Sequence, residues 1–144
     1  MSNTLYDLDF YAWTAEQAAL LRAGRLNQLD IDNIAEEIET LGRSEKRELV
    51  SRLTVLLTHL LKWQYQPGLR CTSWRVTVRG QRDEVTEHLA DNPSLRATVE
   101  AAVATAYRKA RNQAEGESGL SRESFPAACP YPFAAMLRDD FWPE

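Results

Sequence analysis

Residues 31–66 read IDNIAEEIETLGRSEKRELVSRLTVLLTHLLKWQYQ, and this stretch decides the fold class. Its apolar residues recur every three or four positions, which is the spacing of one face of an α-helix. The members of this stripe are Ile31, Ile34, Ile38, Leu41, Leu49, Leu53, Leu56, Leu60 and Trp63. Pro67-Gly68 follows the stretch and ends it. The pattern therefore predicts one long helix from Ile31 to Gln66.

The stripe has one irregular step, between Leu41 and Leu49. A step of eight equals two steps of four, so the apolar residues drift around the helix but stay on one side of it. Gly42 lies in this interval and costs about 1 kcal/mol inside a helix. The sequence favours a continuous or gently bent helix over two independent ones, and it leaves a bend at Gly42 open.

A first helix is expected from about Asp7 to Ala23, because aromatic and leucine side chains recur there at helical spacing. Thr14 with Gln17 resembles a capping box, although it lies inside the periodic stretch, so a cap at Asp7 or Asp9 is the alternative. Gly24 follows the last periodic residue, where a left-handed backbone is expected.

Three further helices follow the long one. We expect them at about Ser73 to Ala90, from an Asn92 cap and Pro93 to near Gly116, and from Pro132 to about Arg138. The prediction is an all-α fold, an irregular helical bundle of four main helices plus a short C-terminal helix. A chain of 144 residues predicts a single domain over residues 1–144.

Composition restricts the function more than it defines it. The chain is 44% hydrophobic and 26% charged with a net charge of -4, so nothing global favours nucleic-acid binding. The start, MSNTLYDLDFYAW, lacks the pattern of a signal peptide, and no apolar run is long enough for a membrane span. Cys71 and Cys129 form no disulfide framework, and their roles are open. A cytoplasmic location without membrane contact is the expectation.

The length of the predicted helix raises the question of a partner chain. A straight helix of 36 residues is about 54 Å long. A compact domain of this chain length is roughly 37–40 Å across. Either the helix bends near Gly42 and folds back, or a second chain covers the exposed part of its stripe. We expect the second arrangement, a homodimer.

An acidic cluster at the start of the long helix is the first candidate site. Glu36 and Glu39 lie three residues apart and share a helix face, so with His59 they could hold a divalent cation or act in catalysis. The Glu-x-x-His spacing of helical di-iron proteins is missing. The favoured alternative is a solvated acidic face that complements the helix dipole.

A run of arginines is the second candidate site. On a helix, Arg75, Arg79 and Arg82 form one row beside Trp74, and such a row could bind phosphates or nucleic acid weakly. The favoured alternative is that these arginines pair with the acidic start of the long helix, within the chain or across a dimer.

The tip of the long helix is the third candidate site. Trp63 and its neighbours could line a small-molecule pocket, but we favour a core role in which Trp63 packs on Trp74. His59 lies one turn earlier and is expected at the edge of the core, hydrogen-bonded to its surroundings. Cys129 has no suitably placed histidine and is a weak candidate nucleophile.

Short motifs spread along the chain resemble one known family. They are Leu5-Tyr6, Asp9-Phe10, Trp13, Glu36-Glu37-Ile38-Glu39, Leu41-Gly42, Arg52-Leu53, Leu60-Leu61-Lys62-Trp63, Tyr65-Gln66-Pro67, Ser73-Trp74, Phe125-Pro126 and Cys129-Pro130. With these motifs the chain resembles the bacterial domain of unknown function 29 family over nearly all of Leu5 to Phe141. The resemblance implies a small all-α bacterial protein, and it supplies no activity, cofactor or catalytic residue.

No P-loop, GxGxxG, GxSxG or HExxH motif is present, so the sequence favours a role without catalysis or a cofactor. Our first hypothesis is a helical interaction protein that self-associates and binds another, unidentified protein. The alternatives are weak phosphate or nucleic-acid binding through the arginine row, and a metal or enzymatic role that uses Glu36, Glu39 and His59.

Overall fold

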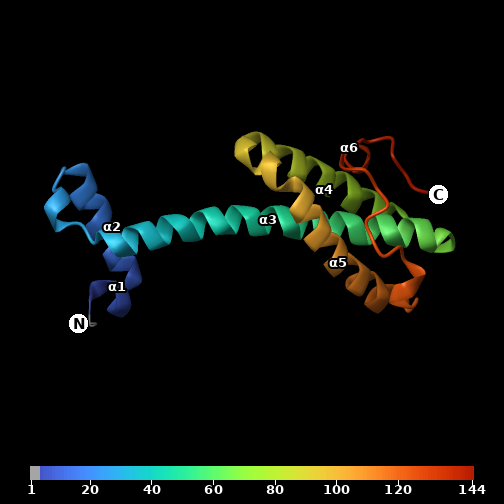
Figure 1. Cartoon of the computed structure of the whole chain (residues 1–144), viewed down its shortest axis with the longest axis horizontal. Coiled ribbons are helices and arrows are strands. Elements are labelled where there is room, and N and C mark those ends of the chain that lie inside the picture. The colour runs from blue at the N-terminus through green and yellow to red at the C-terminus, as the bar shows by residue number, and fades with distance from the viewer. Residues whose placement is uncertain (1–3) are drawn as a thin grey trace. The chain divides into compact units, whose positions relative to one another are not determined.

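The computed structural model describes residues 4–144 (Figure 1). Its α-helices are α1 (Leu5–Leu8), α2 (Phe10–Arg22), α3 (Ile31–Tyr65), α4 (Thr72–Asp91), α5 (Val99–Ser118) and α6 (Phe133–Met136). Short 3-10 turns cover Leu26–Gln28, Pro67–Leu69, Pro93–Thr98 and Arg122–Ser124. No strand occurs within residues 4–144. The predicted all-α fold of four main helices and a short C-terminal helix is confirmed.

The described residues form two compact units. The first ends at Ser44 and the second is Glu45–Glu144, so α3 contributes residues to both. The single domain over residues 1–144 stays a prediction. None of the helices described for residues 4–144 combines the length and apolar character that crossing a membrane requires.

Helix α3 follows the predicted bounds to within one residue. Asp30 accepts the amide hydrogen bond of Ile34 at 2.9 Å at its start, and Pro67 opens the 3-10 turn after its end. Gly42 lies inside α3, and the helix continues through it. The alternative of two independent helices is therefore excluded.

The first predicted helix is divided in two at Asp9. The Asp9 carboxylate accepts a hydrogen bond from the amide of Ala12 at 3.0 Å and caps α2. Of the two alternatives, the earlier cap at Asp9 is therefore confirmed, and the capping box at Thr14 and Gln17 is wrong, because the Thr14 hydroxyl donates to the carbonyl oxygen of Tyr11. Asp9 immediately precedes α2, so its carboxylate is placed to accept a hydrogen bond from one of the unpaired amides of the first turn.

Helix α2 ends as predicted, on a left-handed glycine. Gly24 has φ of +72°, and its amide donates to the carbonyl oxygen of Leu21. The amide of Arg25 donates to the carbonyl oxygen of Leu20. These two bonds define a Schellman motif, which satisfies the last free carbonyls of the helix.

Asp30 joins α2 to the start of α3. Its carboxylate accepts hydrogen bonds from the indole nitrogen of Trp13 at 3.0 Å and from the Asn33 amide group at 2.8 Å. Its own backbone amide donates to the side chain of Gln17 at 2.9 Å. The hydrogen bonds from Asn33 and Trp13 lower the pKa of Asp30, so this carboxylate is ionised at neutral pH.

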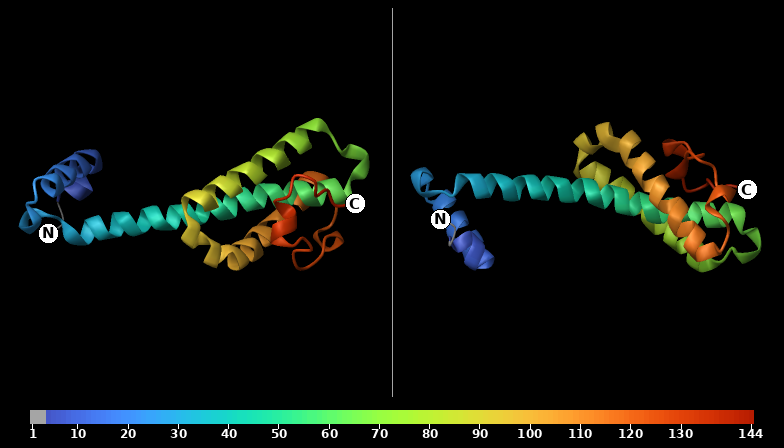
Figure 2. Two further views of the ribbon diagram at one scale, coloured as in Figure 1. Left: turned by 90° about the horizontal axis from the view of Figure 1, so that it is seen from above. Right: turned by 60° about the horizontal axis from the view of Figure 1, so that its bottom comes forward.

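The hydrophobic core belongs to the second unit. In Figures 1 and 2, α4 and α5 run beside the C-terminal half of α3. The α3 side chains that are fully buried there are Leu49, Leu53, Leu56, Leu57, Leu60 and Leu61. Val78 and Val85 of α4 and Ala106 of α5 meet them.

The fourth predicted helix begins later than expected. Residues Pro93–Thr98 form a 3-10 turn, and the α-helix starts at Val99. Asn92 does not cap it, because its side-chain amide donates to the carbonyl oxygen of His88 at the end of α4. The helix ends at Ser118, two residues after Gly116, where Gly119 takes the left-handed conformation with φ of +78°.

We expect the core leucines to dominate the stability of the second unit. Leu57→Ala should lower the free energy of unfolding by about 2–5 kcal/mol, because it removes buried methyl groups and leaves a cavity. Leu69→Ala is the matched control, since Leu69 is exposed, and it should change this free energy by less than about 0.5 kcal/mol. Urea unfolding followed by circular dichroism measures both, and equal effects would contradict the assignment.

Candidate functional site

The first unit carries a large unburied apolar surface. Among residues 4–144, nine of the eleven large exposed apolar side chains belong to it: Leu5, Leu8, Phe10, Tyr11, Leu21, Leu26, Ile31, Ile38 and Leu41. Trp13 is the one apolar side chain that this unit buries within the described residues. A helical unit that exposes most of its own apolar residues has the character of an association surface.

Part of this surface is a regular row on α3. Ile31, Ile38 and Leu41 are 62–67% exposed, and Ile34 between them is half-buried. Their spacing of three, four and three residues places them on one face, as predicted. We call these four residues the N-terminal stripe. The same helical periodicity continues into the leucines of α3 from Leu49 onward, but those leucines are buried whereas the stripe is largely exposed.

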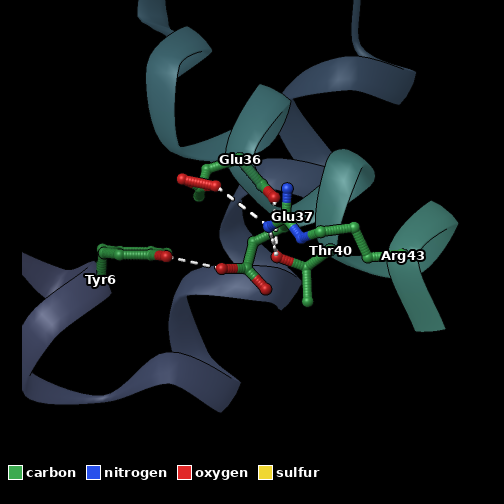
Figure 3. Close-up of polar contacts among 5 residues, drawn as sticks. All are labelled: Tyr6, Glu36, Glu37, Thr40 and Arg43. Atoms are coloured by element: carbon green, nitrogen blue, oxygen red, sulfur yellow. Dashed lines mark hydrogen bonds and ion pairs between the residues drawn. The ribbon is translucent and has the colours of Figure 1, made fainter. Parts of the chain in front are cut away.

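The same segment of α3 carries acidic side chains, and Figure 3 shows two of them, Glu36 and Glu37. Tyr6 donates a hydrogen bond of 2.5 Å to the Glu37 carboxylate, which raises the pKa of Tyr6 to about 12. Glu36 forms an ion pair with Arg43 at 3.4 Å, and both side chains are about half exposed. Glu37 is therefore a structural residue that ties α1 to α3, whereas Glu36 is held only by an exposed pair.

The predicted metal or catalytic group of Glu36, Glu39 and His59 gains no support from its surroundings. Across residues 4–144, no cluster of three or more His, Cys, Asp or Glu side chains could hold a metal ion. His59 is half-buried on α3, and its Nδ1 lies 2.9 Å from the carbonyl oxygen of Val55. Burial lowers the pKa of His59, as expected for a histidine at the edge of the core.

A basic groove lies between α3 and α5 in the second unit. Two adjoining pockets of 340 and 420 Å³ share Lys46, Val50 and Thr105. The remaining lining residues are Arg47, Ser51, Ala97, Thr98, Ala101, Ala102 and Lys109. The groove thus has a floor of small apolar side chains, three cationic groups at its edge, and no acidic side chain in its lining.

Within the described part of the chain, the cations of this groove form no ion pair. None of the salt bridges found among residues 4–144 involves Lys46, Arg47 or Lys109. Sequence reasoning missed this groove because Lys109 is distant in sequence from Lys46 and Arg47. The available signal was the Lys46-Arg47 pair, which lies where α3 changes from acidic to apolar.

The predicted arginine row is divided by burial. Arg75 and Arg79 are exposed on α4, whereas Arg82 is 1% exposed. The Arg82 guanidinium donates to the carbonyl oxygens of Met136 at 2.8 Å and Phe141 at 2.5 Å. Burial lowers the pKa of Arg82. Arg82 therefore anchors the C-terminal segment, and the three arginines do not present one common surface to a ligand.

The expected pairing of these arginines with the acidic start of α3 is not found within the chain. No ion pair among residues 4–144 joins Arg75, Arg79 or Arg82 to an acidic residue of α3. Arg82 instead donates to backbone carbonyls of the C-terminal segment and lies over the Trp142 ring, and Arg75 lies over the Trp63 ring. The pairing across a dimer stays a prediction.

Aromatic rings and cations cluster at the tip of α3. The predicted packing of Trp63 on Trp74 is wrong: the Trp63 ring lies 4.6 Å from that of Trp142, and Arg75 lies over its face. The ring of Trp74 instead lies under the Lys62 ammonium at 4.7 Å. Trp142 of the C-terminal segment packs on Trp63, so a side chain of the protein occupies the place of the small-molecule pocket considered at this tip.

Two polar groups near this tip are also occupied. Lys62 donates a hydrogen bond of 2.7 Å to Glu117 on α5, and this bond lowers the pKa of Glu117. Cys129 is half-buried, and burial raises the pKa of its thiol. A raised thiol pKa disfavours the nucleophilic thiolate, so Cys129 gains no support as a catalytic residue.

Comparison with known families matches residues 5–142 to the one described as Domain of unknown function DUF29. The protein belongs to this family. Neither the curated proteins nor the solved structures include one that matches the chain. The DUF29 description carries no activity, so it assigns no role to any residue. For this DUF29 protein, the physical properties of its surfaces are the basis for a functional proposal.

The anchoring role of Arg82 gives a stability prediction. Arg82→Met keeps most of the side-chain volume but removes the hydrogen-bond donors, and it should lower the free energy of unfolding by about 2–5 kcal/mol. Hydrogen exchange of the amides in residues 137–142 should become faster. Arg79→Met is the control, because Arg79 is exposed on the same helix. Equal exchange in the two variants would contradict the anchor.

The Tyr6–Glu37 bond predicts a pH dependence in the alkaline range. Its contribution to stability is complete below the pKa of about 10 that an unfolded tyrosine has, and is lost as the pH rises toward 12. The difference in free energy of unfolding between the wild type and Tyr6→Phe should therefore shrink over this range. A difference that stays constant from neutral pH to pH 12 would show that the phenol does not donate to Glu37.

Proposed function

We propose that the protein is a small assembly protein whose first unit is an association surface, and that its immediate partner is a second copy of the chain. The observation that carries this proposal is the apolar surface described above: within residues 4–44, nine large apolar side chains are exposed and one is buried. Exposed apolar area of this extent is uncommon on monomers and typical of protein interfaces.

The N-terminal stripe supports a helical partner in particular. Its spacing of three, four and three residues is that of the apolar seam of a coiled coil. In a coiled coil, the seam residues of one helix insert between the side chains of a second helix. Asp32, Glu36 and Glu39 lie outside this row, so a partner helix can approach the stripe without burying a carboxylate. Helix-to-helix association is the mode that this pattern fits best.

Magnitudes suggest that the stripe alone gives weak association. Complete burial of a leucine or isoleucine stabilises by about 1.5–3 kcal/mol. Three such side chains on each of two copies, each 62–67% exposed, give about 6–12 kcal/mol. Association costs on the order of 4–15 kcal/mol, which leaves a dissociation constant no lower than about 1 µM. Further contacts between copies would have to supply the remainder.

We include a further protein partner and a cytoplasmic, bacterial setting in the same proposal. Cys71 and Cys129 are both free thiols, which is the usual state in a reducing compartment. The alternative role in phosphate or nucleic-acid binding is less well supported, because Arg82 is committed to the C-terminal segment and only Arg75 and Arg79 remain exposed. Two arginines neutralise too few phosphates for more than weak binding.

Sedimentation of the purified protein tests the proposal. At roughly 100 µM the wild type should sediment with about twice the chain mass of 16.4 kDa. Ile38→Glu should return it to the monomer, because a charge in the stripe cannot be buried against an apolar partner. Val76→Glu is the matched control: Val76 is similarly exposed and β-branched but lies on α4, and its variant should remain dimeric. A monomeric wild type at this concentration would end the proposal.

A further inference from the structure

We propose that the basic groove between α3 and α5 binds an acidic amphipathic helix of another protein. This inference rests on the further protein partner included in the proposed function, and it gives that partner a binding surface and a chemistry. The groove belongs to the second unit alone, so binding there does not require self-association through the first unit. The charge, the shape and the backbone of the groove each support this occupant.

The charge of the groove is unbalanced. Its lining holds the cations of Lys46, Arg47 and Lys109 and no acidic side chain, and none of these cations belongs to an ion pair found within residues 4–144. Glu45 and Glu48, the acidic neighbours in sequence, contact a histidine of α4 and an arginine of α3 instead. Opposite charge on two surfaces favours their encounter and orientation. The groove therefore favours a partner with carboxylates.

The groove is long and open rather than enclosed. Ala102 is buried, and the other lining residues are half-buried or exposed. Along α5 the lining extends from Ala101 to Lys109, which is about 12 Å or roughly two helical turns. A small-molecule site encloses most of its ligand, and an open groove of this kind does not. Its shape fits the side of a helix better than a compact ligand.

The backbone of the groove also favours a helical occupant. Both of its walls are helices, so most backbone groups along it are already hydrogen-bonded within α3 and α5. An extended peptide needs free backbone partners such as those of a sheet edge, whereas a helix satisfies its own backbone. The small side chains of Val50, Ala101 and Ala102 let a helix approach closely. The occupant that fits is a helix with one apolar face and carboxylates beside it.

The acidic segment of this chain, residues 31–41, does not meet that description. On α3 the carboxylates of Asp32, Glu36 and Glu39 lie on the face away from the N-terminal stripe. The segment therefore cannot present its apolar side chains and these carboxylates to one groove together. A free phosphate would contact the cations but leave the small apolar side chains of the groove uncovered. A helix of another protein satisfies both requirements.

A synthetic helix tests the inference with a probe of defined chemistry. The probe is an end-capped peptide of about 18 residues, cross-linked to hold it helical, with alanine and leucine on one face and glutamate elsewhere. We expect it to bind the wild type with a dissociation constant below about 1 mM. A peptide with lysine in place of every glutamate, and one of the same composition without the apolar face, should each bind at least about tenfold more weakly. Fluorescence anisotropy of the labelled peptides measures all three.

A charge variant tests whether the groove is the binding surface. Arg47→Glu together with Lys109→Glu should weaken the binding of the glutamate peptide at least about tenfold, because like charges then face each other. Arg25→Glu together with Arg79→Glu is the matched control: it makes the same change in net charge at two exposed arginines outside the groove lining. Its dissociation constant should stay within about threefold of the wild type at physiological salt, where charges beyond about 8 Å are screened.

A second variant fills the groove without changing its charge. Ala101→Trp places a large ring where a partner helix would approach, so it should also weaken the binding of the glutamate peptide at least about tenfold. Ala104→Trp is the matched control, because Ala104 is exposed on the same helix but lies outside the groove lining. Its binding should stay within about threefold of the wild type. Circular dichroism checks that the helices of each variant are retained.

The outcomes separate this inference from self-association. Ile38→Glu should bind the glutamate peptide as the wild type does, because Ile38 lies outside the groove lining. A dimeric wild type that does not bind the peptide, or whose groove variants bind it undiminished, overturns the inference alone. A monomeric wild type that binds the peptide in the groove overturns self-association alone. Weaker binding by the charge variant but not by Ala101→Trp also overturns the inference, since attraction of any polyanion would then explain the binding.

Discussion

The burial of one face of α3 is the constraint on which the second unit depends. Six leucines between Leu49 and Leu61 are fully buried, and the valines of α4 and the alanines of α5 pack against them. Because these leucines all lie in the C-terminal half of α3, α4 and α5 both pack beside that half. Earlier along the same helix, between Ile31 and Leu41, apolar residues at similar spacing have no such cover. One helix thus combines a satisfied face and an unsatisfied one.

Local signals predicted the elements well. Helical periodicity and Pro67-Gly68 fixed α3 to within one residue, and Gly24 marked the end of α2. The choice of capping residue was harder to predict. For α2 the sequence left Thr14 and an earlier aspartate open, and Asp9 is the cap. The predicted Asn92 cap is wrong, because the Asn92 side chain bonds back to α4. Both cases concern which of two nearby polar groups satisfies a backbone group, and periodicity carries no information on that choice.

The candidate sites were harder to predict than the fold. The exposed apolar row followed from the stripe, and His59 was expected at the edge of the core. The burial of Arg82 could not be inferred, because its partners are backbone oxygens of a turn-rich segment more than fifty residues later. The basic groove likewise depends on how α3 and α5 pack. Sequence patterns within one helix identify faces, but pairing between helices decides which faces remain accessible.

The way in which Arg82 holds the C-terminal segment has a consequence for how that segment can vary. Its acceptors are main-chain oxygens, which every residue type supplies. Replacement of the exposed side chains of Arg138 or Asp140 leaves those oxygens in place. Insertion or removal of a single residue between Met136 and Phe141 moves one oxygen out of reach of the guanidinium. This part of the chain is therefore tolerant of changes in composition and intolerant of changes in length.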